Sequence, residues 1–144
     1  MATRTTRVVL RLTHDARLVA AVGGAVGYFA DQAGLDAHTR ADLVAATEEA
    51  CRDTFPLLTP FDPVLGVQIE GFPERIEVTF EHHGQQVPTA GLESFTAHGQ
   101  EGSGVGGSSG LRLLSRVDRV KYNSEGGTSR MTLVKYVRTR PGEK

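Results

Sequence analysis

Two carboxylates stand four positions apart in the stretch AATEEACRDTF, residues 45–55. If this stretch is a helix, Glu49 and Asp53 lie on one face of it, one turn apart. A solvated helix surface is one interpretation of such a pair. The other is catalytic: one carboxylate polarises a hydroxyl group or a water molecule, while the other binds a magnesium ion, which prefers oxygen ligands. The spacing alone leaves both interpretations open.

A glycine-rich segment, GSGVGGSSG, occupies residues 102–110 and precedes an apolar run. Gly102, Gly104 and Gly107 satisfy the spacing G-x-G-x-x-G, but a dinucleotide site needs a strand directly before that motif, and FTAHGQ does not predict one. Two interpretations remain: a flexible linker, or a loop that surrounds a phosphate group in front of a helix capped by one of the serines in SSG. Only 34 residues follow this segment, which is short for a second domain.

Histidine and cysteine do not form a set suited to catalysis or to a metal-dependent hydrolase. His82 and His83 are adjacent in a predicted strand, so their side chains point to opposite faces and do not bind one metal ion together. The other histidines are scattered along the chain. Cys51, the single cysteine, cannot form an internal disulfide. It faces a different side of the helix from Glu49, which predicts a core residue.

Hydrophobic periodicity predicts the elements that position these residues. Alternation predicts strands, and apolar residues at helical spacing predict helices with Asp15 and Asp36 as N-terminal caps. The predicted order is a strand over 4–13, helices over 14–34 and 36–55, a hairpin over 63–83, a helix over 108–120 and two final strands over 119–139. Strands cluster more than they alternate with helices, so we expect an α+β two-layer sandwich rather than a doubly wound parallel sheet.

The composition describes one ordinary globular domain that spans residues 1–144. Hydrophobic residues make up 39% of the chain and charged residues 23%, and the formal net charge of −1 gives no support to a general polyanion-binding role. No apolar run is long enough to span a membrane, and no secretory leader is present. We therefore expect a cytoplasmic protein.

Charge is unevenly distributed along the chain. Residues 31–101 contain 13 acidic side chains and three arginines, whereas residues 111–140 contain eight basic and two acidic side chains. The basic segment keeps a nucleic-acid-binding domain open as an alternative, although only Tyr122 and Tyr136 offer it aromatic rings for base stacking. The asymmetry also suits a small phosphorylated ligand held with a cation between the two halves.

Taken in order, these segments resemble the anti-sigma-factor serine kinases of the GHKL ATPase superfamily, which have the histidine-kinase-like (Bergerat) fold. The resemblance covers nearly the whole chain and rests on DLVAATEEAC, a strand ending in HHG, the glycine-rich segment, GLRLLSRVDRV and GGTSRMTLVKY. It implies a mixed, mainly antiparallel sheet covered by helices on one face, a flexible lid at about 96–110, and ATP with magnesium as cofactors. It also implies a protein partner: a sigma factor or an antagonist protein in bacterial partner switching.

The resemblance assigns roles to individual residues. Glu49 matches the general base of a serine/threonine protein kinase, and Asp53 stands where the family has its magnesium-binding asparagine. Gly84 matches the first glycine of the adenine-binding D-x-G-x-G box, whose aspartate position is held here by His82. Thr128 matches the threonine of the G-T pair that completes the adenine pocket.

The lid of the family matches the glycine-rich segment, and the matched residues are Gly104, Gly107 and Gly110, with Leu111 opening the helix behind them. Three positions depart from the family pattern: aspartate replaces asparagine at 53, histidine replaces aspartate at 82, and Gln86 replaces the second glycine of the adenine box. These departures keep a second interpretation open, a protein-binding module on the same fold without ATP turnover. The sequence also leaves open whether the chain forms a homodimer.

Overall fold

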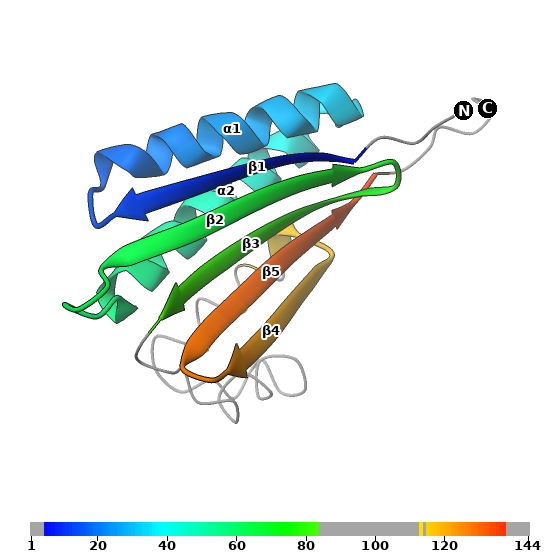
Figure 1. Ribbon diagram of the computed structural model, residues 1–144. Helices are drawn as coiled ribbons and strands as arrows, with labels where there is room; N and C mark the ends of the chain where they lie inside the picture. Colours follow the sequence, from blue (N-terminus) through cyan, green and yellow to red (C-terminus); the bar gives the residue numbers. More distant parts are fainter. Residues whose placement is uncertain (1–4, 84–112, 114, 138–144) are drawn as a thin grey trace.

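The computed structural model describes residues 5–83, 113 and 115–137, which form five strands and two α-helices (Figure 1). The elements are β1 (Thr6–Thr13), α1 (Arg17–Ala33), α2 (Ala37–Thr54), a short 3₁₀ turn (Phe55–Leu57), β2 (Val64–Phe72), β3 (Arg75–His83), β4 (Arg119–Glu125) and β5 (Thr128–Tyr136). Neither α-helix in this part of the chain is long and apolar enough to cross a membrane.

The five strands form one antiparallel sheet in the order β1-β2-β3-β5-β4. We expected a mixed sheet, but every pairing between the described strands is antiparallel. The connections give the reason: α1 runs back along the sheet and α2 returns, so β2 starts beside the end of β1 and runs in the opposite direction (Figure 1). The pairs β2/β3 and β4/β5 are hairpins with two-residue turns, which also join antiparallel strands.

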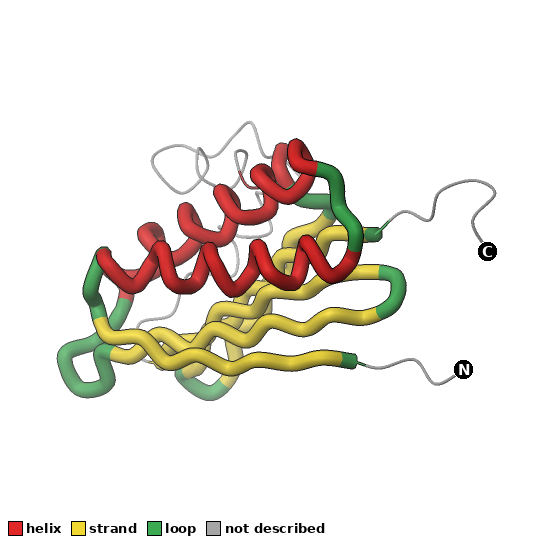
Figure 2. Tube along the Cα trace, turned by 90° about the horizontal axis from the view of Figure 1, so that it is seen from above, coloured by secondary structure: helices red, strands yellow, loops and turns green. Residues whose placement is uncertain are grey.

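Both helices cover the same face of the sheet, which gives two layers with the core between them (Figure 2). They contribute apolar residues such as Val22, Val26 and Leu43, all fully buried. Facing residues on β2 and β3 alternate with less buried ones, and six of them are at most 1% exposed: Leu65, Val67, Ile69, Ile76, Val78 and Phe80. This burial pattern is typical of a two-layer α+β sandwich, so that prediction is confirmed.

The helix ends follow their predicted signals with one shift. Asp36 caps α2, since its carboxylate accepts a hydrogen bond of 2.7 Å from a backbone N–H in the first turn. Gly34 ends α1 at a φ of 79°, in the left-handed conformation that glycine adopts readily. At the start of α1 the cap is Ala16 rather than the predicted Asp15, whose carboxylate accepts instead from the backbone N–H of Arg17.

Candidate functional site

Glu49 and Asp53 lie on the side of α2 that faces away from α1. A methyl group added at Gly27 of α1 would overlap the Arg40 guanidinium, so Arg40 marks the side of α2 that packs on α1. Glu49 follows Arg40 by nine residues, which is about two and a half helical turns, and therefore lies on the opposite side. Asp53 comes one turn later on the same face, as the spacing predicted.

The last two turns of α2 bring these carboxylates to a defined end of the sheet. Helix α2 ends at Thr54, and the chain enters β2 at Val64 after a short connection. The end of β3 and the start of β5 lie at this same end, because β3 is antiparallel to both β2 and β5 (Figure 1). Glu49 is half-buried and Asp53 is exposed.

Three polar side chains form a row across the helix-facing side of the sheet at this end. His82 on β3 is paired with Ser129 on β5, which is paired in turn with Ser124 on β4. His82 is 4% exposed and Ser129 is 2% exposed, although the next helix-facing residues on the two strands are the apolar Phe80 and Met131. We call His82, Ser124 and Ser129 the polar row.

Each member of the polar row has a buried polar atom for which the described residues provide no hydrogen-bond partner: Nδ1 of His82, Oγ of Ser124 and Oγ of Ser129. Neighbouring Tyr122 does not change this: burial raises its pKa and Ser129 lowers it in part, but no hydrogen bond of regular geometry satisfies Ser129 Oγ. An unpaired buried polar group costs about 1–3 kcal/mol, and such groups are rare in folded proteins. Three of them in one row indicate a place where a polar ligand or ordered water supplies the partners.

Burial also sets the protonation state of His82. It lowers the pKa of the imidazole, because removal from water disfavours the charged form. His82 is therefore neutral at neutral pH, with one ring nitrogen that donates a hydrogen bond and one that accepts. Together with the two serine hydroxyls, which can each donate and accept, it gives the polar row a mixed hydrogen-bonding character without a formal charge.

Thr128, which the resemblance assigns to the adenine pocket, lies on the other face of the sheet. Its hydroxyl is 3.0 Å from Nδ1 of His83, its cross-strand partner. Neighbouring residues of a strand point to opposite faces, so Ser129 rather than Thr128 shares the helix-facing side with His82. The prediction that His82 and His83 point apart is confirmed, since the first is buried and the second exposed.

Sequence reasoning missed Ser124 and Ser129, although a signal for both was present. The helix-facing positions of β4 read Val120, Tyr122 and Ser124, and those of β5 begin with Ser129 before Met131. Each serine is thus a polar residue in phase with an apolar face. The two serines interrupt the apolar faces of adjacent strands, near the two-residue glycine turn that joins these strands. Such a pair of polar residues predicts a shared polar patch.

The remaining predicted residues lie outside the described part of the chain. The helix predicted over 108–120 is described only in its later part, where the N–H of Val117 donates to the carbonyl of Leu113 and both side chains are buried in the core. Among the described residues there is no group of three or more histidine, cysteine or acidic side chains suited to a metal ion. The predicted residues outside the description are Gly84, Gln86, Gly104, Gly107, Gly110 and Leu111, with the segment 96–110.

Comparison with protein-family models and with curated proteins gave no match. The assignment of a function therefore rests on three things. These are the polar row, the position of Glu49 and Asp53 on α2, and the resemblance carried by the sequence motifs.

Proposed function

We propose that this protein is a cytoplasmic, nucleotide-binding regulator of the anti-sigma serine kinase type, which binds ATP at the polar row and acts on a protein partner. The observation that carries the proposal is the polar row: three buried polar atoms without partners among the described residues, on three adjacent strands. The partner that the resemblance implies is a sigma factor or an antagonist protein in bacterial partner switching.

The chemistry of the polar row suits the edge of a purine ring. Such an edge presents accepting ring nitrogens beside an exocyclic amino group that donates. Neutral His82 and the two serine hydroxyls offer both donors and acceptors, so they can pair with either kind of group. Met131 lies next to the row on the same side of the sheet and is only partly buried, so it can add apolar contact for a planar ring.

The carboxylates of α2 supply the groups that phosphoryl transfer requires. In the proposed reaction Glu49 acts as general base towards the serine hydroxyl of a protein substrate, and Asp53 provides an oxygen ligand for magnesium. Their place on the flank of α2 away from α1, at the sheet end that holds the polar row, supports this assignment. A magnesium ion at Asp53 offsets the negative charge that aspartate adds relative to asparagine.

A second function is supported by the identity of His82. A neutral imidazole accepts a hydrogen bond through one nitrogen, whereas the carboxylate at this position in the family accepts through two charged oxygens. Hydrogen bonding to a purine amino group is therefore weaker with His82 than with the carboxylate of the family. This observation favours a protein-binding module that keeps the fold and the partner surface without ATP turnover.

Calorimetric titration with ATP, with and without magnesium, separates the two functions. The nucleotide proposal predicts magnesium-dependent binding by the wild-type protein, loss of the magnesium dependence in Asp53→Ala, and retained binding in Glu49→Gln. Glu48→Gln is the matched control, because the Glu48 carboxylate lies against Gly23 of α1 and not on the flank with Glu49. We expect this control to bind like the wild type.

Two results would contradict nucleotide binding at this site. One is a folded wild-type protein that gives neither heat nor a rise in melting temperature at millimolar ATP, because a ligand that binds only the native state must stabilise it. The other is a loss of binding in Glu48→Gln as large as in Asp53→Ala. The first result leaves the protein-binding module as the function, and the second shows that the face of α2 is irrelevant.

A further inference from the structure

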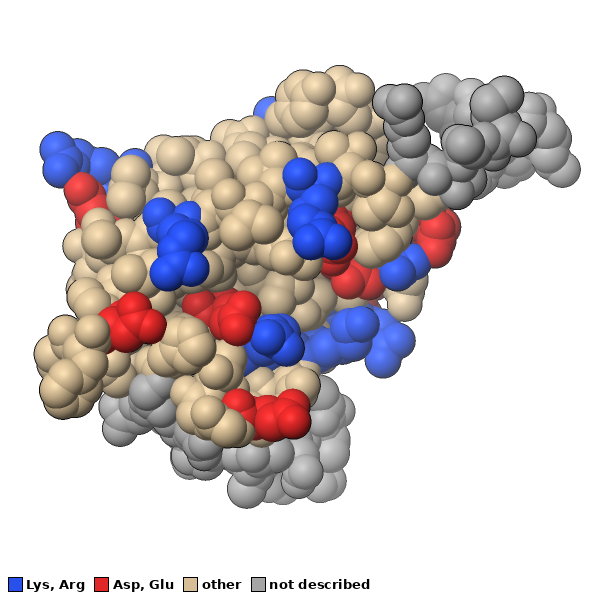
Figure 3. Space-filling view, viewed as in Figure 1, with Lys and Arg blue, Asp and Glu red and all other residues tan. Residues whose placement is uncertain are grey.

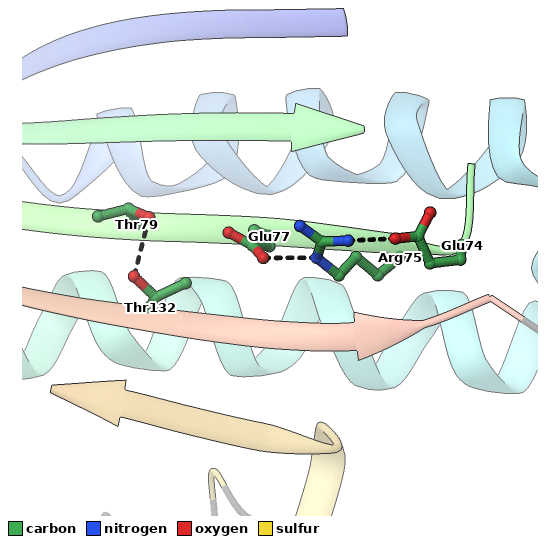
Figure 4. Close-up of polar contacts among 5 residues, drawn as sticks. All are labelled: Glu74, Arg75, Glu77, Thr79 and Thr132. Carbon is green, nitrogen blue, oxygen red and sulfur yellow. Dashed lines mark hydrogen bonds and ion pairs between the residues drawn. The ribbon is translucent and has the colours of Figure 1, made fainter. Parts of the chain in front are cut away.

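The outer face of the sheet, which neither α1 nor α2 covers, is crossed by a ladder of polar pairs between β3 and β5. The ladder stops at Val134, which faces Glu77 and has no polar side-chain group to offer. The pairs that precede this point are His83 with Thr128 at 3.0 Å, Glu81 with Arg130 at 3.1 Å, and Thr79 with Thr132 at 3.0 Å. Figure 4 shows the last of these pairs.

A hollow of about 300 Å³ opens on this face where the ladder stops. Val134, 2% exposed, lies at its base, because the side chains around it are longer. Tyr136 stands beside Val134 and is held in place by its backbone N–H, which donates to the Asp118 carboxylate at 2.7 Å. The hollow therefore has an apolar base that is surrounded by charged side chains.

The basic side chain on the β3 side of the hollow is already paired with carboxylates. Arg75 forms ion pairs with Glu74 and with Glu77, the second through a hydrogen bond of 2.6 Å (Figure 4). The hydrogen bond to Glu77 raises the pKa of the Arg75 guanidinium. A ligand gains little by competing for this cation, because two carboxylates already neutralise it.

The basic side chains on the β4 side of the hollow have no such pairing with described residues. Arg119 and Lys121 are exposed and line the hollow, and neither has an ion pair or a side-chain hydrogen bond with another described residue. Basic side chains gather on the side of this face where Figure 1 draws β4, as Figure 3 shows. The positive charge of this wall is thus available to an external anion.

We propose that this hollow docks an extended, acidic segment of a protein partner that carries two carboxylates two residues apart. Arg119 and Lys121 are alternate residues of one strand, so they point to the same side and their Cα atoms are about 6.5–7 Å apart. Alternate residues of an extended peptide have the same spacing, and a Glu-x-Glu segment therefore matches the two cations. Val134 and Tyr136 provide apolar contact for the stems of the glutamates.

The charges around the hollow favour a peptide over a nucleic acid. Glu74 and Glu77 stand on the wall opposite the free cations, where a continuous phosphate backbone would meet them. Tyr136 is the single aromatic residue among the described residues that line the hollow, which gives little support for base stacking. The site is independent of the proposed nucleotide function, because it lies on the opposite face of the sheet from the polar row.

A titration followed by ¹H–¹⁵N NMR tests the proposal on the full chain. The probe is the peptide acetyl-Glu-Val-Glu-Val-Glu-amide, and the lysine version of the peptide, free glutamate and a ten-nucleotide oligothymidylate are the comparison ligands. We expect the acidic peptide alone to shift the amide signals of residues 119–121 and 134–136. The double variant Arg119→Gln with Lys121→Gln should bind it about tenfold more weakly, since each exposed ion pair contributes a modest free energy.

Arg11→Gln is the matched control, because Arg11 is an exposed arginine of the edge strand β1, outside the hollow. It should bind like the wild type. The NMR spectrum of each variant shows directly whether it is folded. Absence of shifts, equal binding of the lysine peptide, of free glutamate or of the oligothymidylate, or equal weakening by Arg11→Gln would each overturn the proposal.

Discussion

Replacing Ser129 with alanine should stabilise the ligand-free protein, which is the reverse of the usual effect of a core substitution. The hydroxyl of Ser129 is buried and has no partner among the described residues. An unsatisfied buried hydroxyl costs about 1–3 kcal/mol, and the substitution removes it with the loss of a single heavy atom. Allowing for water that reaches the row and for the small cavity, we expect the free energy of unfolding to rise by about 1–2 kcal/mol.

Urea denaturation followed by circular dichroism measures this change. For a domain of this size, 1 kcal/mol corresponds to about 3 °C in melting temperature, so Ser129→Ala should melt about 3–6 °C higher than the wild type. Excess ATP with magnesium should narrow the difference. Under the proposed function the wild type gains the full stabilisation of a bound ligand, whereas the variant has lost one hydrogen-bonding group for that ligand and gains less.

Thr47→Val is the matched control for the loss of a buried hydroxyl. Thr47 is fully buried, and its hydroxyl donates to the carbonyl of Leu43 at 2.8 Å. Removing this paired group should lower the free energy of unfolding by about 1 kcal/mol. If Ser129→Ala lowers stability as much as Thr47→Val, Ser129 has a partner in the native protein, and the polar row is not a set of unpaired groups that a ligand could satisfy.

Gly24→Ala should raise the free energy of unfolding by about 1 kcal/mol, since alanine favours the helix and the added methyl group meets open space. Gly23→Ala should raise it less, because its methyl group displaces the Glu48 carboxylate. Chemical denaturation measures both changes, and equal gains would refute the close packing at Gly23. Cys51 should react with iodoacetamide at pH 8 only in urea, because burial raises its pKa to about 12 from an ordinary 9.0. For the same reason the free energy of unfolding should fall as the pH rises above about 9. Mass spectrometry and unfolding curves test these two expectations, and rapid alkylation of the native protein would refute the first. The pKa of His82, measured by NMR, should lie below the ordinary histidine value of 6.5, because the side chain is buried. The free energy of unfolding should therefore fall as the pH drops below about 6.5. An ordinary pKa would show that the imidazole is not desolvated.

Local patterns were sufficient to predict most of the fold. The alternation of Ile76, Val78 and Phe80 with polar residues fixes one buried face of β3, and the carboxylate of Asp36 marks the start of α2. The strand order could not be predicted in the same way, because β3 and β5 are far apart in sequence and no local signal encodes their pairing. The last turn is also tighter than the predicted Asn-Ser-Glu-Gly-Gly: Gly126 and Gly127, at φ of 58° and 82°, form it alone.

The positions of the candidate residues were predictable on the helix, but not on the strands, where they depend on register. A spacing of four is enough to place Glu49 and Asp53 on one face of α2, whatever the helix packs against. On a strand, a shift of one residue moves a side chain to the opposite face of the sheet. The sequence motif therefore indicated Thr128, while the register places Ser129 opposite His82.

The polar row spans three adjacent strands, β3, β5 and β4, at one end of the sheet. Helix α1 contacts β2 and β3, and α2 contacts β3, the strand that carries His82. Ser129 and Ser124 lie on the next two strands of the sheet, β5 and β4. A core closed by apolar packing alone would have apolar residues at these positions. Polar residues at these positions cost stability in the free protein, and under the proposed function a ligand that occupies the row would offset that cost.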